Sequence, residues 1–418
     1  MMTQAYYTGI SGLKNSSTGI DIVSDNLANV NTMGFRGNNY EFASLFEDSL
    51  ATTSNITSNS IGLGTRIQAS PMTQTQGSFM ATERSTDLAI MGEGWFGIEG
   101  ESSPLYTKNG AFSFDVDGDL VTDDGHYVLG TMAGNINGNT LTEQVGQTPL
   151  GTVTEQKKLR FPNELTFPVA PTTKAEFSGN IGTEDKLRTM SATVIDANGN
   201  QNELKLEFTK AAQQTPPGIQ WDVTAVTRDK NDPKNVFDTQ NGLVSFDANG
   251  ALISSTLPAI DNNGTPITID LGKGFDGVVG IANLDISAYS SADGNAEGDL
   301  VGYDINKNGD VVATFTNGMQ SSVGKVAVYH FQNDQGLDRI SGTYFATSAN
   351  SGQPIFYQDA NGQNIIGTDM TNFKLEGSNV DMTVGLTDLI ILQRTYDANS
   401  KSITTADQMI QKALNMDA

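Results

Sequence analysis

The sequence contains no cysteine, few basic residues and no long run of apolar residues. The absence of cysteine excludes disulfide bonds, thiolate nucleophiles and cysteine-ligated metal sites. Its 48 acidic residues against 24 Lys and Arg give a formal net charge of −24, which repels nucleic-acid phosphates and anionic lipids. No stretch is apolar enough to span a bilayer, and no basic start followed by an apolar run marks a Sec signal peptide. We therefore expect no nucleic-acid partner, no membrane insertion and no Sec-type export.

Groups suited to catalysis are also sparse. The chain has only two histidines, His126 and His330, and neither lies near a nucleophile pattern such as G-x-S-x-G. Carboxylates are plentiful, but their spacing singles out no catalytic pair of the glycoside hydrolase type. We therefore expect no enzyme activity and no catalytic residue.

Two short motifs resemble ligand sites without completing them. Gly92, Gly94 and Gly97 spell G-x-G-x-x-G, but the residues that follow cannot open a helix, so a strand and turn are expected there. Residues 304–309 match the first half of a calcium loop, whose bidentate Glu would fall at Phe315. We expect no metal and no cofactor, with a secreted calcium- or glycan-binding β protein as the alternative from another class.

Both ends of the chain carry apolar residues at alternating steps of three and four, which predicts helices. One apolar stripe on a lone helix is marginal in water, so each helix needs a partner. The first helix can pack on the last within one chain, or both can pack on copies of the same molecule. The predicted self-assembly stripe consists of Leu13, Ile20, Val23, Leu27, Val30, Leu389, Leu392, Tyr396, Ile403, Ala406 and Ile410.

The middle of the chain reads as antiparallel β structure, because Asp-Gly and Asn-Gly turns separate short runs of β-branched and aromatic residues. The expected fold is multidomain and mainly β with terminal α-helices, its β domains looped out between the two ends. We predict a helical coiled-coil domain from 1–30 with 376–418, and an extended connector over 31–70. An inner β domain should comprise 71–147 with 286–375, and an outer β domain 148–285.

Two long terminal segments resemble the signatures of one protein family. SGLKNSSTGIDIVSDNLANVNTMGFRGNNYEF at residues 11–42 is similar to the N-terminal signature of flagellar rod and hook axial proteins. The segment LEGSNVDMTVGLTDLIILQRTYDANSKSITTADQMIQKALNM resembles their C-terminal signature. The residues that carry this signature are Asn26, Asn29, Asn31, Gly34, Phe35, Asn379, Gln393 and Arg394. SATVIDANGNQNELKLEFTK resembles the outer domain that separates hook proteins from the shorter distal rod protein.

The resemblance implies a structural subunit of the bacterial flagellar hook. Such a subunit polymerises into a bendable hollow helical tube that transmits motor torque from rod to filament, with a distal rod subunit as the alternative. The implied partners are further copies of the chain, the distal rod protein, the hook cap and the hook–filament junction proteins. Export through the flagellar type III apparatus and an extracellular location in the hook or basal body are also implied.

Overall fold

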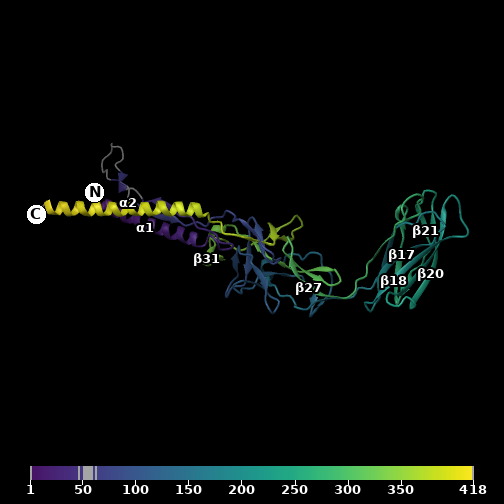
Figure 1. The fold of residues 1–418 in the computed structure, drawn as a ribbon. Helices are drawn as coiled ribbons and strands as arrows, with labels where there is room; N and C mark the ends of the chain where they lie inside the picture. Colours follow the sequence, from purple (N-terminus) through teal and green to yellow (C-terminus); the bar gives the residue numbers. More distant parts are fainter. Residues whose placement is uncertain (1, 46–47, 50–59, 62–63, 417–418) are drawn as a thin grey trace.

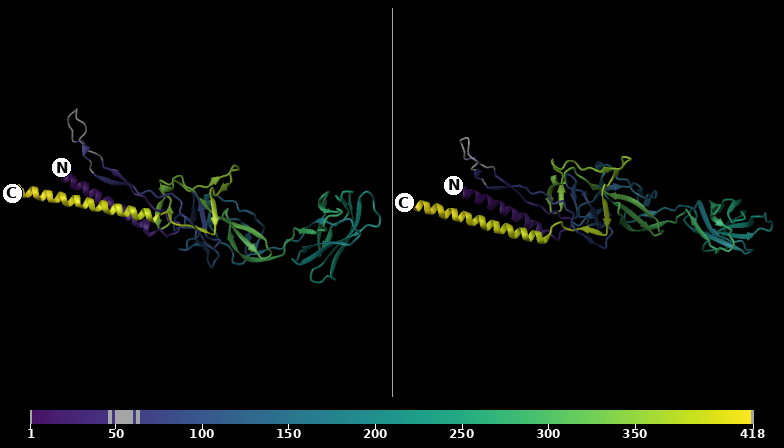
Figure 2. Two further views of the ribbon diagram at one scale, coloured as in Figure 1. Left: turned by 45° about the horizontal axis from the view of Figure 1, so that its top comes forward. Right: turned by 90° about the horizontal axis from the view of Figure 1, so that it is seen from above.

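The computed structural model describes residues 2–45, 48–49, 60–61 and 64–416. The chain forms an elongated molecule with a pair of helices at one end and two β bodies in a row (Figures 1 and 2). We call the β body next to the helices the inner body and the distal one the outer body. Both termini lie at the helical end, so the chain runs out to the outer body and returns (Figure 1). The predicted fold class, mainly β with terminal helices, is confirmed.

The helices are α1 (Met2–Ala28) and α2 (Met382–Met416). Asp381 is the N-cap of α2. Its Oδ1 accepts hydrogen bonds from the N–H groups of Thr383 at 2.7 Å and Val384 at 3.2 Å. These N–H groups have no partner inside the helix, so an acidic cap stabilises this end. The last strand before α2 ends at Glu376, and residues 376–381 of the predicted helical unit are therefore not helical.

The inner body is built from two larger sheets and several strand pairs around two apolar clusters. The eight-stranded sheet has the order β12 (Ile136–Asn137), β13 (Thr140–Leu141), β15 (Thr166–Phe167), β27 (Gly298–Ile305), β28 (Asp310–Phe315), β29 (Gln320–Val326), β11 (Leu129–Met132) and β14 (Lys157–Lys158). The five-stranded sheet has the order β30 (Val328–Tyr329), β7 (Trp95–Ile98), β8 (Leu105–Thr107), β32 (Tyr344–Ala346) and β31 (Asp338–Ser341). Two short 3₁₀ helices, η1 (Val153–Glu155) and η2 (Asp334–Gly336), also lie in this body.

Six further strand pairs occur in the described chain, and two of them join distant parts of it. They are β9 (Phe112–Phe114) with β10 (Leu120–Thr122), β6 (Leu88–Met91) with β35 (Asp369–Asn372), β5 (Phe79–Ala81) with β36 (Lys374–Glu376), β33 (Tyr357–Gln358) with β34 (Asn364–Ile365), β1 (Glu41–Ser44) with β4 (Thr65–Ala69), and β2 (Asp48–Ser49) with β3 (Ser60–Ile61). The pairs β5–β36 and β6–β35 are antiparallel. These two pairs hold the part of the chain that returns to α2 beside the part that leaves α1.

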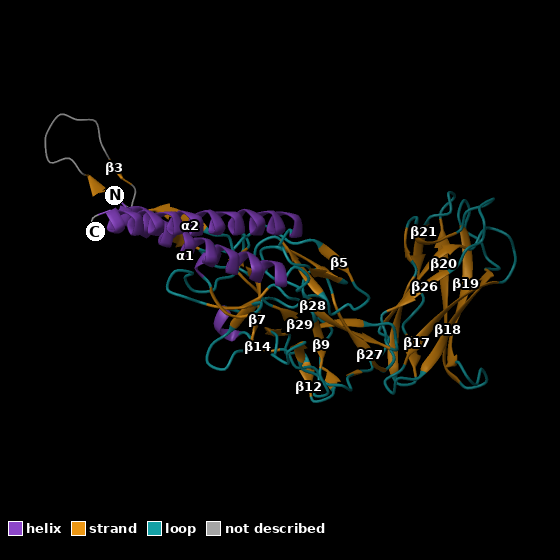
Figure 3. Cartoon of the chain, turned by 60° about the vertical axis from the view of Figure 1, so that its left-hand side comes forward, coloured by secondary structure: helices purple, strands orange, loops and turns teal. Residues whose placement is uncertain are grey.

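The outer body is a sandwich of two sheets with its own apolar cluster, which includes Trp221 and Phe208 (Figure 3). One sheet has the order β17 (Arg188–Ile195), β18 (Gln201–Lys210), β19 (Ile219–Asp229), β20 (Val236–Phe246) and β21 (Leu252–Ser255). The other has the order β22 (Ile260–Asn262), β23 (Thr265–Asp270), β16 (Lys174–Asn180), β25 (Asp276–Val279) and β24 (Gly272–Lys273), with β26 (Tyr289–Ala292) paired to β16. Apolar residues alternate along β18, as expected for a strand with one buried face.

The boundaries predicted for the outer domain need correction. Leu159, Phe161 and Leu165 are buried in the inner body, although they lie inside the predicted outer range of 148–285. At the other boundary, β26 pairs with the outer strand β16 beyond residue 285. The two crossing segments meet where Ala170 and Asn295 exchange two backbone hydrogen bonds of 2.9 and 2.8 Å. Pro162 and Pro168 therefore precede the crossing and Pro171 directly follows it. The four-part division with these shifted limits stays a proposal.

The predicted connector at 31–70 is also anchored more firmly than expected. Phe35 and Arg36 are 1% and 3% exposed, because this stretch packs between α1 and the inner body. Further along the chain, β1 and β4 pair as an antiparallel ribbon in which Glu41 lies opposite Ala69. This ribbon contacts α1. Residues 46–47, 50–59 and 62–63 of this prediction lie outside the described residues.

Candidate assembly site

The helices α1 and α2 lie side by side and run antiparallel within one chain (Figures 1 and 3). Glycines on α1 make this close approach possible. A Cβ atom at Gly9 would lie 2.7 Å from Cγ1 of Ile403, and one at Gly12 would lie 2.6 Å from the amide nitrogen of Asn399. Since real Cβ atoms do not approach so closely, a larger residue there would force the side chain of Ile403 or Asn399 to move. Gly9 and Gly12 thus leave room for these two side chains of α2.

Part of the predicted self-assembly stripe is used by this contact within the chain. Val23, Leu392 and Ala406 are 4%, 4% and 6% exposed, so they are not free to contact a second copy in this arrangement. Tyr396 is 41% exposed. Seven residues of the stripe are half-buried: Leu13, Ile20, Leu27, Val30, Leu389, Ile403 and Ile410. The assembly role of the stripe stays a prediction, and its three buried members act inside the helix pair.

A second apolar surface on α2 remains exposed, and the predicted self-assembly stripe does not include it. Four large residues carry it, with exposed fractions between 44% and 54%: Leu386, Ile390, Ile391 and Met409. The run LTDLIILQ at 386–393 contained the signal, because its five apolar residues are too many for one stripe of a helix. Such a surface on an elongated helix indicates contact with another protein. We call these four residues the outer face of α2.

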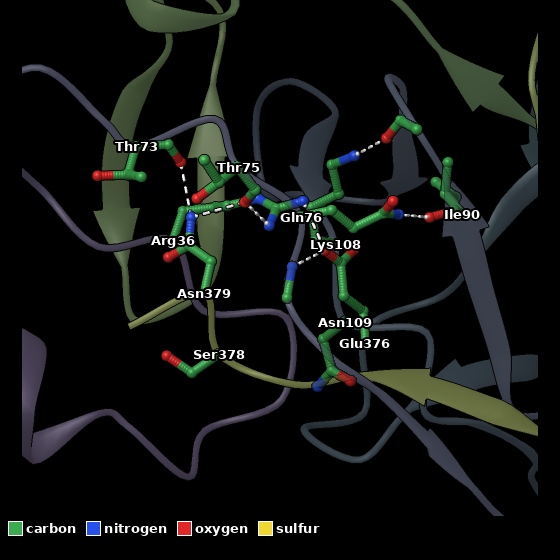
Figure 4. A network of polar contacts seen from close by, with 12 residues as sticks. Arg36, Thr73, Thr75, Gln76, Ile90, Lys108, Asn109, Glu376, Ser378 and Asn379 are labelled. Carbon is green, nitrogen blue, oxygen red and sulfur yellow. Dashed lines mark hydrogen bonds and ion pairs between the residues drawn. The ribbon is translucent and has the colours of Figure 1, made fainter. Parts of the chain in front are cut away.

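Below the helices, the signature residues form a polar junction (Figure 4). Asn379 donates to the carbonyl oxygens of Thr73 and Thr75 at 2.8 and 2.9 Å and accepts from the N–H of Gly37 at 2.8 Å. Asn26 on α1 bonds Asn38 twice through backbone groups, at 2.7 and 2.9 Å. These backbone groups lie outside regular helices and sheets. The two side-chain amides supply the hydrogen-bond partners that a sheet would otherwise provide.

A buried ion pair lies at the centre of the junction. The guanidinium of Arg36 is 2.8 Å from Oε1 of Glu376, and the two side chains are 4% and 0% exposed. Oε1 also accepts from the N–H of Gly77 at 2.9 Å, and Arg36 donates to the carbonyl of Thr75 at 2.9 Å. The pair therefore joins the outgoing chain after α1 to the returning chain before α2.

Aromatic rings and one further cation complete the attachment. The guanidinium of Arg339 on β31 lies over the rings of Phe35 and Phe345 at 4.7 and 5.2 Å from their centroids and donates to the carbonyl of Arg36. Burial lowers the pKa of Arg339, opposed by the charge of Asp25. Gly34 has φ +67°, and a Cβ there would lie 2.4 Å from the backbone nitrogen of Asn109. This position therefore requires glycine.

The junction contains half of the eight family signature residues. Asn26, Gly34, Phe35 and Asn379 make the contacts described above. Asn29 bonds the carbonyl of Asp25 at 2.9 Å within the last turn of α1. Three other signature residues are exposed and make no contact with the junction in the described structure: Asn31, Gln393 and Arg394.

Lys108 is buried beside the ion pair and donates to the carbonyl of Gly92 at 2.9 Å (Figure 4). Burial and then the charge of Arg36 lower the pKa of Lys108 to about 8. Between pH 8 and the ordinary lysine pKa of 10.5, the unfolded chain holds a proton that the folded chain has lost. Raising the pH through this window therefore stabilises the folded inner body.

This titration gives a measurable pH dependence. From pH 7.5 to pH 10 the native protein should gain about 2 kcal/mol of unfolding free energy relative to Lys108→Met, in which the titrating group is absent. Urea unfolding followed by fluorescence of Trp95, in a Trp221→Phe background that leaves one tryptophan, measures this difference. Parallel pH profiles for the two proteins would show that Lys108 stays charged in the fold.

The groups considered for catalysis or metal binding have structural surroundings. His330 is buried, its Nε2 lies 2.7 Å from the carbonyl oxygen of Ile366, and burial lowers its pKa. Asp115 and Asn306 each use a side-chain oxygen to accept backbone N–H groups of their own turns. Within the described residues, no three His, Asp or Glu side chains are grouped as metal ligands. No helix of the described chain is both long and apolar enough to cross a membrane.

Four family models match the chain in sequence order. "Flagella basal body rod protein" matches residues 7–36, and "Flagellar hook protein FlgE/F/G D1 domain" matches 89–155. "Flagellar basal body protein FlaE D2 domain" matches 165–378, about half of the chain, and "Flagellar basal body rod FlgEFG protein C-terminal" matches 373–416.

Whole proteins give the same result. The chain is 28% identical to the flagellar hook protein FlgE of Escherichia coli K12 and 27% identical to that of Borreliella burgdorferi, over 99% of this chain and 100% of each relative. The crystal structure of flagellar hook protein FlgE2 from Helicobacter pylori has a similar fold. Its TM-score is 0.55 at 17% identity, covering 71% of this chain and 100% of that chain.

Proposed function

The chain belongs to the flagellar hook protein family, and on that premise we propose that its copies polymerise through the helix pair into the hollow tube of the hook. The observation that carries this mechanism is the outer face of α2, which one chain leaves uncovered. Repeating one contact between different surfaces of identical subunits produces an open helical polymer. The predicted stripe residues that are half-buried would border this contact, and the polar positions of both helices would face water.

The two β bodies suit a tube that bends while it transmits torque. The inner body is tied to both helices by the buried junction, so rotation of the helical core is passed to it. The outer body has its own apolar cluster and is linked by two chain segments (Figure 2), so it can shift against neighbouring outer bodies. Sliding of packed domains of this kind is a recognised form of structural change.

The remaining expectations from the resemblance are part of this proposal. The tube would contact the distal rod protein at its base, and the hook cap and then the hook–filament junction proteins at its tip. The chain would leave the cell through the flagellar type III apparatus and work outside the cell as part of the hook. A structural role, without catalysis, suits a family named for flagellar hook and rod proteins.

Electron microscopy of the purified chain tests polymerisation. The full chain at high protein or salt concentration should form short curved tubes. A chain limited to residues 29–381 should remain a folded monomer, because it keeps Arg36, Glu376 and Asn379 but lacks both helices. Tubes formed by this shortened chain would refute the role of the helices.

A further inference from the structure

Five turns of the two β bodies share one pattern of hydrogen bonds. In each, a side-chain oxygen of the first residue accepts from the N–H groups two and four positions later, at 2.8–3.0 Å. The fourth residue is a glycine with positive φ in every turn. The turns span 115–119, 196–200, 247–251, 306–310 and 359–363. Their equivalent positions can therefore be compared directly.

The second position distinguishes the turn at 115–119 from the others. Ala197, Ala248 and Ala360 occupy this position in three turns and Lys307 in a fourth. The turn at 115–119 has Val116, whose exposed fraction of 91% is the highest given for any large apolar residue of the described chain. Turns favour small and polar residues, and a β-branched apolar side chain in water contributes nothing to this one. Its neighbour Asp117 has a side chain that is 75% exposed, 3.7 Å from Arg160.

Elsewhere on the inner body, a cleft of about 910 Å³ lies between the β33–β34 pair and the turn at 306–310. Three exposed apolar side chains line it: Met91, Tyr357 and Ile365, each between 41% and 49% exposed. Lys307, at the tip of one of the five related turns, also lines the cleft and has no carboxylate within ion-pair distance in the described structure.

We propose that the Val116 turn of one copy inserts into this cleft of a second copy during polymerisation. Val116 would pack on the apolar rim, and Asp117 would pair with Lys307. Glu93, Asp359 and Asp369 also line the cleft, as does Lys325, which is buried and lies 3.3 Å from Asp310. Lys307 is therefore the cation left for the carboxylate of Asp117, which fixes the direction of the turn. The inference rests on the proposed function, since it requires a polymer of this chain.

The two surfaces share no residue, so the contact joins different surfaces of identical subunits. Such a contact does not close on itself and propagates along a fibre. Each inner body would then contact the inner body of a neighbouring copy, in addition to the contacts made by the helices. A second copy is a better occupant than another protein, because the complementary turn and cleft belong to the same chain.

Cysteine cross-linking tests the contact directly, since the natural chain has no cysteine. Tubes assembled from a variant with Val116→Cys and Ile365→Cys should give a ladder of covalent multimers after mild oxidation. Mixed tubes of the two single variants should give only dimers, which excludes a bond within one chain. Tubes that give no ladder would overturn the proposal. So would tubes in which the thiol of the Val116→Cys variant still reacts with maleimide, and the cleft would then have a different occupant.

Charge exchange tests the orientation. Asp117→Lys and Lys307→Glu should each raise the critical concentration for assembly by about fivefold, as expected for one exposed ion pair. The combination should restore it, which no folding defect would do. No rescue, with both single variants at the native critical concentration, would sink the pairing. If tubes still form by the helices without any ladder, this inference fails and the proposed function stands.

Discussion

Replacing Ile390 and Ile391 on the outer face of α2 by Asp should abolish tube formation while the monomer stays folded. These side chains are 52% and 54% exposed in one chain, so about half of each is free to contact a second copy. In a polymer they would be buried, at about 1.5 kcal/mol or more for each side chain. Losing both should raise the critical concentration by at least about 100-fold. Turbidity and electron microscopy measure this directly.

A control variant adds the same charge to α2 at positions outside its outer face. Thr395→Asp with Ser400→Asp adds the same two negative charges at exposed polar positions of α2 outside this face and should leave assembly within a fewfold of the native chain. Circular dichroism should show equal helix content in all three proteins. Assembly of the Ile390 and Ile391 variant at the native concentration would remove the outer face of α2 from the mechanism.

The helices could be predicted from the sequence because their periodicity is local. Their mutual packing could not, since it depends on which small residues face the partner. Gly9 and Gly12 look like weak points of a helix, yet they allow Ile403 and Asn399 to approach. For the same reason, Leu392 was predicted to contact other copies, although Gly19 and its neighbours on α1 cover it.

The junction was predicted only as a set of signature residues without a role. Arg36 and Glu376 stand at opposite ends of the chain, and nothing in either local pattern shows that they form a buried pair. Likewise, Leu159 and Phe161 lie near prolines that suggested a domain boundary. They flank the ion-paired Arg160 in the segment after β14, where Arg160 forms an isolated β-bridge with Asp119 of the inner body. Burial of a residue depends on the whole fold, and local sequence does not report it.

Glu376→Ala should be the most destabilising single change in the junction. It leaves the guanidinium of Arg36 buried without its counter-charge and removes the acceptor of the Gly77 N–H. Breaking such a buried pair costs about 3–5 kcal/mol. Urea unfolding followed by Trp95 fluorescence in the Trp221→Phe background should show this loss, and the outer body, with its own core, should keep its stability.

A double-mutant cycle separates the ion pair from simple loss of packing. Arg36→Met combined with Glu376→Ala should cost less than the sum of the two single changes, because no unpaired charge is left in the interior. Glu376→Gln keeps an acceptor for Gly77 and should fall between the native protein and Glu376→Ala. A Glu376→Ala protein within about 1 kcal/mol of native stability would mean that water reaches Arg36. The helices would then be held to the inner body chiefly by the Asn379 amide and by the stacking of Arg339 on Phe35.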